Sequence, residues 1–280
     1  MHPNPAAHRG KTPVGVPSPT GPALAAIGVT AYLLGTIFHE ALGHGLAALA
    51  VGLHPSRVSS VDLAVSFLGA PPWKVRIVAA AGCIGNLVLA ALAMTAYRLA
   101  VRRGAATRFF LWLLATTSIL SPGGYLMVLA IPGIGDWGDF VRGFAHPWAW
   151  KIALTILGVA ISLLGLVWGS RQLATFLPPQ HSFRDGFRLA LIPYLAGSLI
   201  ATLAGVFNPT SPLLILISAM AASFGGTAWL LWVGSIAGRR PGLAAPASPA
   251  LRWERSAAWL WIGGAAAIVY VGVLGPGLPR

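Results

Sequence analysis

Two histidines and a glutamate lie within six residues of one another at the end of an apolar segment, in the sequence His39-Glu40-Ala41-Leu42-Gly43-His44. Imidazole and carboxylate groups are costly to bury in an apolar environment unless they pair or bind a metal. Neutral imidazoles are good zinc ligands, and an adjacent glutamate can take a proton from a zinc-bound water. The set therefore predicts a Zn²⁺ site with Glu40 as the general base.

The spacing of the two histidines constrains the backbone that carries them. Zinc hydrolases usually have H-E-x-x-H, with histidines four residues apart on one helical face. On a regular α-helix, His39 and His44 would point about 140° away from each other, because they are five residues apart. Residues four apart differ by only about 40°. A single-turn π-bulge would realign them, and Gly43 and Gly45 would tolerate it.

Two alternatives to this ligand pair stay open. Glu40 and His44 are four residues apart and could be the ligands, with His39 in another role. We favour the two histidines, because a glutamate that acts as base needs a water held by the imidazoles. The histidines could also simply bond to backbone carbonyls, or to each other, at a helix end.

A histidine pair with this spacing also occurs in membrane di-iron hydroxylases and desaturases. Those proteins need about eight histidines. This chain has seven, and it contains no H-x-x-H-H. We therefore disfavour the di-iron interpretation.

A catalytic zinc needs a third protein ligand, and the chain has only six acidic residues from which to choose. Asp136 directly ends the third apolar run and is our first choice, with Asp139 as the alternative metal ligand. Asp185 and Glu254 lie in basic loops, and Asp62 lies in a polar segment.

Two further features of the apolar runs bear on a site. Asn86 places an amide inside the second run, where it could orient a substrate carbonyl or bond to a neighbouring helix. Ser121-Pro122-Gly123-Gly124 predicts a break in the third run, with exposed backbone that lines a cavity and admits water.

The composition sets the class of protein that must position these residues. Of 280 residues only 9% are charged and 56% are hydrophobic, with a mean hydropathy of +0.75. So few charges cannot cover the surface of a soluble domain, and so many apolar residues exclude disorder. A single cysteine, Cys83, excludes a disulfide framework within the chain. The net charge of +13 comes from basic residues between apolar segments, which argues against a nucleic-acid partner.

The remaining class is an integral membrane protein that interacts with the lipid bilayer. Its uncharged runs predict an all-α bundle of six to seven transmembrane helices, at residues 21–38, 77–97, 109–135, 152–170, 189–238 and 256–279. The fifth run is about twice the length of one span and is divided by the turn signal at 208–212. The first continues to about residue 53, so it must tilt, kink or protrude. The polar segment near 57–70 predicts an extended hairpin or a re-entrant loop.

The chain divides into three parts. Residues 1–20 contain five prolines and predict a disordered tail, residues 21–145 the metal-site core, and residues 146–280 additional transmembrane helices. With the N-terminus in the cytoplasm, 13 of the 19 basic residues lie in inner segments. The positive-inside rule therefore favours this orientation and places the metal site on the outer side of the membrane, the plasma (inner) membrane in our prediction. The sequence does not predict the oligomeric state.

Together these motifs resemble the site-2-protease-type intramembrane zinc metalloproteases, the M50 peptidases. The segment from His39 to Leu49 looks like the family's H-E-L-G-H-A-x-A-A helix with one residue inserted. The segment from Ala80 to Leu89 looks like its A-G-P-x-x-N-x-x-L-A helix, with Cys83 in place of proline. Residues 58–74 are similar in position to its membrane-associated β-hairpin.

The resemblance implies zinc ligands at His39, His44 and Asp136, and Glu40 as general base for peptide hydrolysis. The implied substrate is a transmembrane or membrane-proximal protein segment. The alternative functions are a catalytically degenerate relative that acts as a membrane binding or scaffold protein, and, third, a transporter with broken helices.

Overall fold

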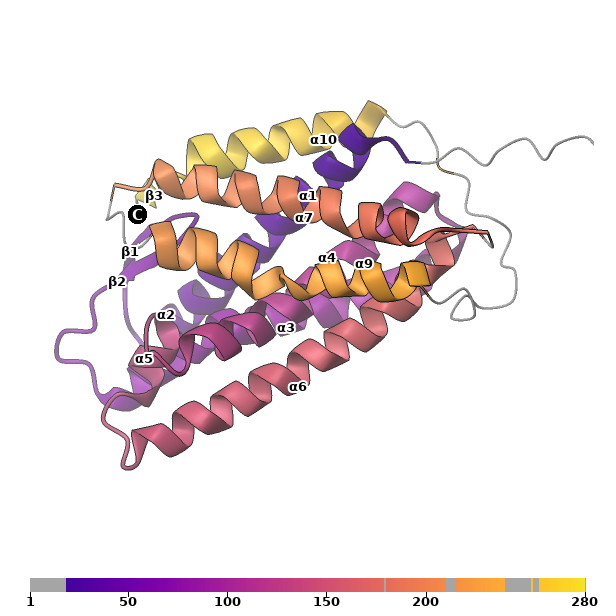
Figure 1. The fold of residues 1–280 in the computed structure, drawn as a ribbon. Coiled ribbons are helices and arrows are strands. Elements are labelled where there is room, and N and C mark those ends of the chain that lie inside the picture. Colours follow the sequence, from indigo (N-terminus) through magenta and orange to yellow (C-terminus); the bar gives the residue numbers. More distant parts are fainter. Residues whose placement is uncertain (1–18, 179, 210–214, 240–252, 254–256, 280) are drawn as a thin grey trace, which may run out of the picture.

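The computed structural model describes residues 19–178, 180–209, 215–239, 253 and 257–279. Nearly all of the predicted N-terminal tail, and residues 210–212 of the predicted turn, lie outside these residues. Within them, seven helices are long and apolar enough to cross a membrane (Figure 1). The prediction of an all-α multi-pass membrane protein is therefore confirmed. The spans are Gly21–Ala50, Pro72–Arg102, Ala105–Leu129, Pro147–Phe176, Phe183–Val206, Ala219–Arg239 and Ala257–Leu274.

The first span is composite, as its length predicts. It consists of α1 (Gly21–Thr36), a π-helix η1 (Ile37–Gly45) and α2 (Leu46–Ala50). The Thr20 side chain accepts a hydrogen bond from the backbone N–H of Ala23 at the N-terminus of α1. The π-helix falls on the histidine motif.

Helices α3 (Pro72–Leu99) and α4 (Ala105–Leu129) form the next two spans and flank the 3₁₀ turn η2 (Ala100–Arg102). The predicted break at residues 121–124 is wrong, because α4 continues through Pro122. A membrane helix tolerates an internal proline when neighbouring helices pack closely around the freed backbone. Here a Cβ on Gly123 would lie 2.5 Å from Ser162 Oγ, and one on Gly124 would lie 2.2 Å from the carbonyl oxygen of Gly226.

A short helix, α5 (Asp136–Val141), connects α4 to α6 (Pro147–Leu173), which the 3₁₀ turn η3 (Ala174–Phe176) extends. The remaining helical elements are α7 (Phe183–Val206), the π-helix η4 (Ile215–Gly225), α9 (Trp229–Arg239), α10 (Ala257–Ile268) and the π-helix η6 (Val269–Leu274). The predicted division of the long fifth run is confirmed, since α7 ends at Val206 and the next described helix begins at Ile215.

The polar segment after α2 forms the predicted extended hairpin. Strands β1 (Pro55–Val58) and β2 (Leu63–Val65) pair antiparallel, with Val58 opposite Leu63. A strand that the sequence did not predict, β3 (Leu278–Pro279), pairs antiparallel with the other edge of β1, so the strand order is β2-β1-β3.

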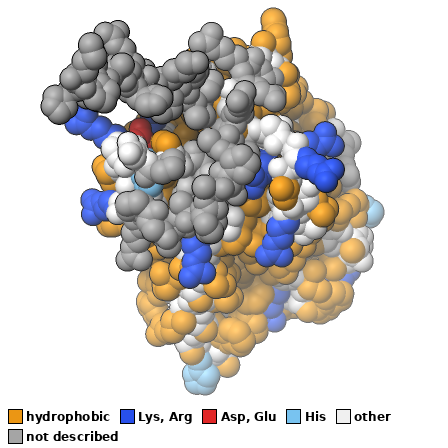
Figure 2. All heavy atoms as spheres, turned by 90° about the vertical axis from the view of Figure 1, so that its right-hand side faces the viewer, with side chains coloured by type: hydrophobic (Ala, Val, Ile, Leu, Met, Phe, Trp, Pro, Cys, Tyr) orange, Lys and Arg blue, Asp and Glu red, His pale blue; other side chains and the backbone are white. Residues whose placement is uncertain are grey.

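The two ends of the bundle differ in composition. The sheet, α5 and the C-terminus lie at one end, and α1 begins at the other (Figure 1). Trp73, Trp148 and Trp150 are exposed at the starts of α3 and α6 on the sheet end. Exposed tryptophans at helix ends are typical of a membrane–water interface. Lysine and arginine side chains gather at the opposite end (Figure 2).

Candidate metal centre

The π-helix η1 brings the two histidines to one side of the first span. Its hydrogen bonds run from residue i to i+5, so residues five apart stack as residues four apart do in an α-helix. The imidazole centroids of His39 and His44 are 4.8 Å apart, and the rings are nearly perpendicular, at 83°. The predicted π-bulge is confirmed, and it extends over nine residues.

Glycines allow α3 to lie directly against the histidine motif. A Cβ on Gly43 would lie 2.6 Å from the carbonyl oxygen of Ala81, and a Cβ on Gly85 would lie 2.5 Å from that of Phe38. A Cβ on Gly82 would lie 2.4 Å from His44 Nε2 and 2.7 Å from His39 Nε2. The backbone of Gly82 therefore forms one wall of the site.

The turn after α4 delivers Asp136 to the same point. Gly135, which precedes α5, has a positive φ of 65°, a conformation that favours glycine. A Cβ there would also lie 2.4 Å from Tyr125 Oη. The same phenol oxygen accepts a hydrogen bond from the backbone N–H of Asp136, at 3.4 Å. Tyr125 and Gly135 thus fix the start of α5.

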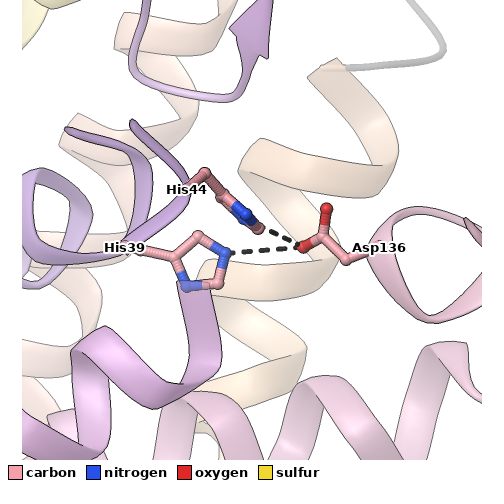
Figure 3. Close-up of side chains that lie close together, drawn as sticks. All are labelled: His39, His44 and Asp136. Carbon is pink, nitrogen blue, oxygen red and sulfur yellow. Dashed lines mark ion pairs between the residues drawn. The ribbon is translucent and has the colours of Figure 1, made fainter. Parts of the chain in front are cut away.

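Three candidate ligands converge (Figure 3). Asp136 Oδ2 lies 3.3 Å from His44 Nε2 and 3.6 Å from His39 Nε2. All three ligand atoms lie within 4.8 Å of one another. The His44 side chain is only 6% exposed, and that of Asp136 is 27% exposed.

The hydrogen bond behind His44 determines its tautomer. His44 Nδ1 lies 2.7 Å from the carbonyl oxygen of Val78, which can only accept, so Nδ1 carries the proton. In the neutral ring, His44 Nε2 and Asp136 Oδ2 then both present lone pairs to one point, and these repel unless a cation lies there. When the imidazoles of His44 and His39 are protonated, their charge and hydrogen bonds lower the pKa of Asp136 by more than burial raises it, so the net pKa is below the ordinary value. Asp136 is therefore an anion, which pairs with protonated imidazoles and could equally bind a cation.

The amide of Asn86 determines the tautomer of His39 in the same way. Asn86 Nδ2 lies 3.3 Å from His39 Nδ1, while Asn86 Oδ1 is buried and has no hydrogen-bond partner among the described residues. The oxygen and nitrogen of an amide are assigned from the hydrogen bonds around them. With the amide turned over, Oδ1 accepts the Nδ1–H of His39 and is satisfied. His39 Nε2 then also presents a lone pair to Asp136.

The donor set suits a divalent cation of the zinc type. Two imidazole nitrogens and one carboxylate oxygen are typical ligands of a catalytic zinc site that keeps one position open. Bonds of about 2.1 Å in a tetrahedron place ligand atoms about 3.4 Å apart. The two distances to Asp136, 3.3 and 3.6 Å, are close to this spacing.

The other predicted site residues lie around the cluster without joining it. Glu40 is half-buried and lines the same cavity as the ligands, and it is not one of the clustered groups. Asp139 also lines the cavity, but its carboxylate pairs with Arg142 at 2.8 Å. Burial raises the pKa of Asp139 by more than Arg142 lowers it. The structure thus groups His39 with His44 and Asp136, and the roles of all these residues stay predictions.

The cavity beside the cluster has a volume of about 260 Å³. The hairpin, α1, α3 and α4 line it, and so do Ser223, Thr227 and Tyr270 from the C-terminal half. Sequence reasoning missed these residues, together with Gly82 and Tyr125. The run of small residues from Ala79 to Gly82 was the available signal for Gly82, whereas single hydroxyls in apolar helices carry none.

No family model, curated protein or solved structure matches this chain.

Proposed function

We propose that this protein is a membrane-embedded, zinc-dependent metallopeptidase of the M50-like type. The observation that supports this proposal most is the convergence of His39, His44 and Asp136, which come from two separate elements, on one point. The hydrogen bonds at the two Nδ1 atoms leave lone pairs of both Nε2 atoms for a metal. The motif resemblance supplies the reaction class.

Glu40 is the general base in this proposal. When bound, a zinc ion would polarise the scissile carbonyl and lower the pKa of a nearby water. Glu40 lines the cavity next to the ligands and accepts a proton from that water as it attacks the peptide carbonyl carbon. The protonated Glu40 then donates to the leaving amine, which separates as the C–N bond breaks. Asn86, on the cavity wall, holds His39 and orients the substrate.

The position of the site suggests the class of substrate. The ligands lie at the end of the bundle where the hairpin and α5 lie, and the hairpin forms part of the cavity wall. A peptide that is cleaved there comes from a transmembrane or membrane-proximal segment of another protein. With the N-terminus in the cytoplasm of the cell, this end faces the outer side of the plasma (inner) membrane.

A Glu40→Gln substitution tests the proposed chemistry. We expect the variant to retain zinc and to lose casein hydrolysis in detergent micelles by about 10²–10⁴-fold, because the amide cannot accept the proton. Asp139→Asn is the matched control, since it removes a carboxylate from the same cavity but outside the cluster. Full hydrolysis by Glu40→Gln, or hydrolysis by the wild type that persists after zinc is chelated, would overturn the proposal.

A further inference from the structure

The cavity extends beyond the metal cluster toward the middle of the membrane span. Along α4 it is lined by Tyr125 beside Asp136, and then by Ser121, Ser118 and Thr117. Tyr125 and Thr117 are eight positions apart on the helix, which corresponds to a depth of about 12 Å. We call this part, lined by α4 from Thr117 to Ser121, the inner arm.

Hydroxyl groups from the C-terminal half form the opposite wall of the inner arm. Thr227 bonds to Tyr32 of α1 with 2.6 Å between the oxygens, and Tyr270 of η6 bonds to Thr36. Ser223 and Thr227 each donate to a backbone carbonyl one turn earlier. A hydroxyl that already donates can still accept, so this wall offers acceptor sites.

Unsatisfied polar atoms gather on the same cavity. Ser118 Oγ is buried, with the residue only 2% exposed, and it has no hydrogen-bond partner among the described residues. Ser60 Oγ is also buried without a partner among them, and both residues line the cavity. By contrast, Thr117, the neighbour of Ser118 on α4, donates to the carbonyl of Leu113. A buried hydroxyl without a partner indicates a bound polar molecule that supplies one.

We propose that the inner arm is a water-binding chamber that the C-terminal helices complete. The cavity is many times larger than the roughly 10–15 Å³ that one water requires. Water supplies two donors to walls that present acceptors, and it also accepts from Ser118. A peptide offers only one N–H per residue and satisfies such walls less completely.

The chamber gives the C-terminal half a role in the reaction. Because the inner arm and Glu40 line one cavity, water stored there reaches Glu40 without crossing lipid. This use of the water rests on the proposed hydrolytic function. The presence of water in the inner arm does not, so the two can be tested apart.

Cysteine accessibility tests the chamber directly. Cys83 is the only cysteine of the chain, so Cys83→Ala provides a clean background for Ser118→Cys and Ser121→Cys. Ser162→Cys is the matched control, because Ser162 is as buried as Ser118 but packs between α6 and α4 and does not line the cavity. Each variant, in lipid nanodiscs, is treated with a small cationic methanethiosulfonate. The reagent modifies the thiolate, which forms only where water is present.

We expect both chamber variants to be modified at least about tenfold faster than Ser162→Cys, and all three to react equally in denaturing detergent. Modification of Ser121→Cys alone would confine water to the neighbourhood of the metal cluster and overturn the chamber. Equal rates for all three in nanodiscs, or no reaction at Ser118→Cys and Ser121→Cys, would also overturn it. Fast labelling of both chamber variants in a protein without peptidase activity would support the chamber and contradict the proposed peptidase function.

Discussion

At the scale of single residues, the site depends on what lies behind each ligand. His44 is oriented by the Val78 carbonyl and His39 by the Asn86 amide, so each ring presents Nε2 to Asp136. Partners of this kind fix the tautomer and orientation of metal-binding histidines. The missing side chain of Gly82 matters equally, because both Nε2 atoms lie within 2.7 Å of the position that its Cβ would take.

Gly82→Ala is therefore expected to weaken metal binding strongly. The added methyl group would lie 2.4 and 2.7 Å from the two Nε2 atoms, so the rings must move off the ligand position. Zinc affinity, measured by competition with a chelator, should fall by at least about 100-fold. Gly264→Ala is the control, because a Cβ at Gly264 meets no atom within 4 Å. Unchanged affinity in Gly82→Ala would contradict the position of the ligands.

At the scale of elements, the π-helix explains how a motif with one additional residue still forms a site. The i to i+5 hydrogen bonds take up the residue between His39 and His44 that the usual zinc-hydrolase motif lacks. The α4–α6 connection contributes the third candidate ligand, Asp136. Arg76 of α3 holds this connection by donating to the carbonyls of Phe140 and Arg142, at 3.3 and 3.2 Å.

Deletion of Leu42 is expected to convert η1 to a regular α-helix and to keep the site. The two histidines would then be four residues apart and about 40° from each other. Leu42 is 41% exposed, so its loss costs little packing. Metal analysis should find zinc retained. Deletion of the buried Leu33, outside the motif, should rotate the motif away from Asp136 and lose the zinc. Loss of zinc on deleting Leu42 would show that the π-helix does more than realign the histidines.

Much of this arrangement was predictable from local sequence. Histidines five residues apart can face one point only on a distorted helix, and an aspartate at the end of an apolar run is expected at a membrane boundary. The continuity of α4 through Pro122 was not predictable, because it depends on contacts of Gly123 and Gly124 with distant helices. The pairing of β3 with β1 depends in the same way on how the last helix returns to the hairpin.

At the scale of the whole molecule, the two halves of the chain share one site. The C-terminal half lines the cavity and also supports the hairpin, since Asn208 Nδ2 donates to Ser59 Oγ at 2.9 Å and the carbonyl of Leu274 accepts from Ser60 N–H at 2.7 Å. The sequence predicted these helices but gave no indication of this role. Long-range hydrogen bonds between single polar residues leave no local pattern.

Seven spans place the two termini on opposite sides of the membrane. Among the described residues, eight arginines lie at the end where α1 begins, and five basic residues lie at the sheet end. The positive-inside rule therefore predicts a cytoplasmic N-terminus and a C-terminus outside. Reporters that are active on only one side of the membrane, fused to each terminus in turn, measure this. Two termini on the same side, or the opposite orientation, would contradict it.

The most direct test of the metal centre is the zinc content of the purified protein. We expect about one zinc per chain in the wild type and in Asp139→Ala, and none in His44→Ala or Asp136→Ala. The reason is that His44 and Asp136 belong to the cluster, whereas Asp139 does not. Each variant is checked for folding by its thermal unfolding in the same detergent. Zinc that persists in a folded Asp136→Ala protein, or a wild type that binds none, would contradict the account.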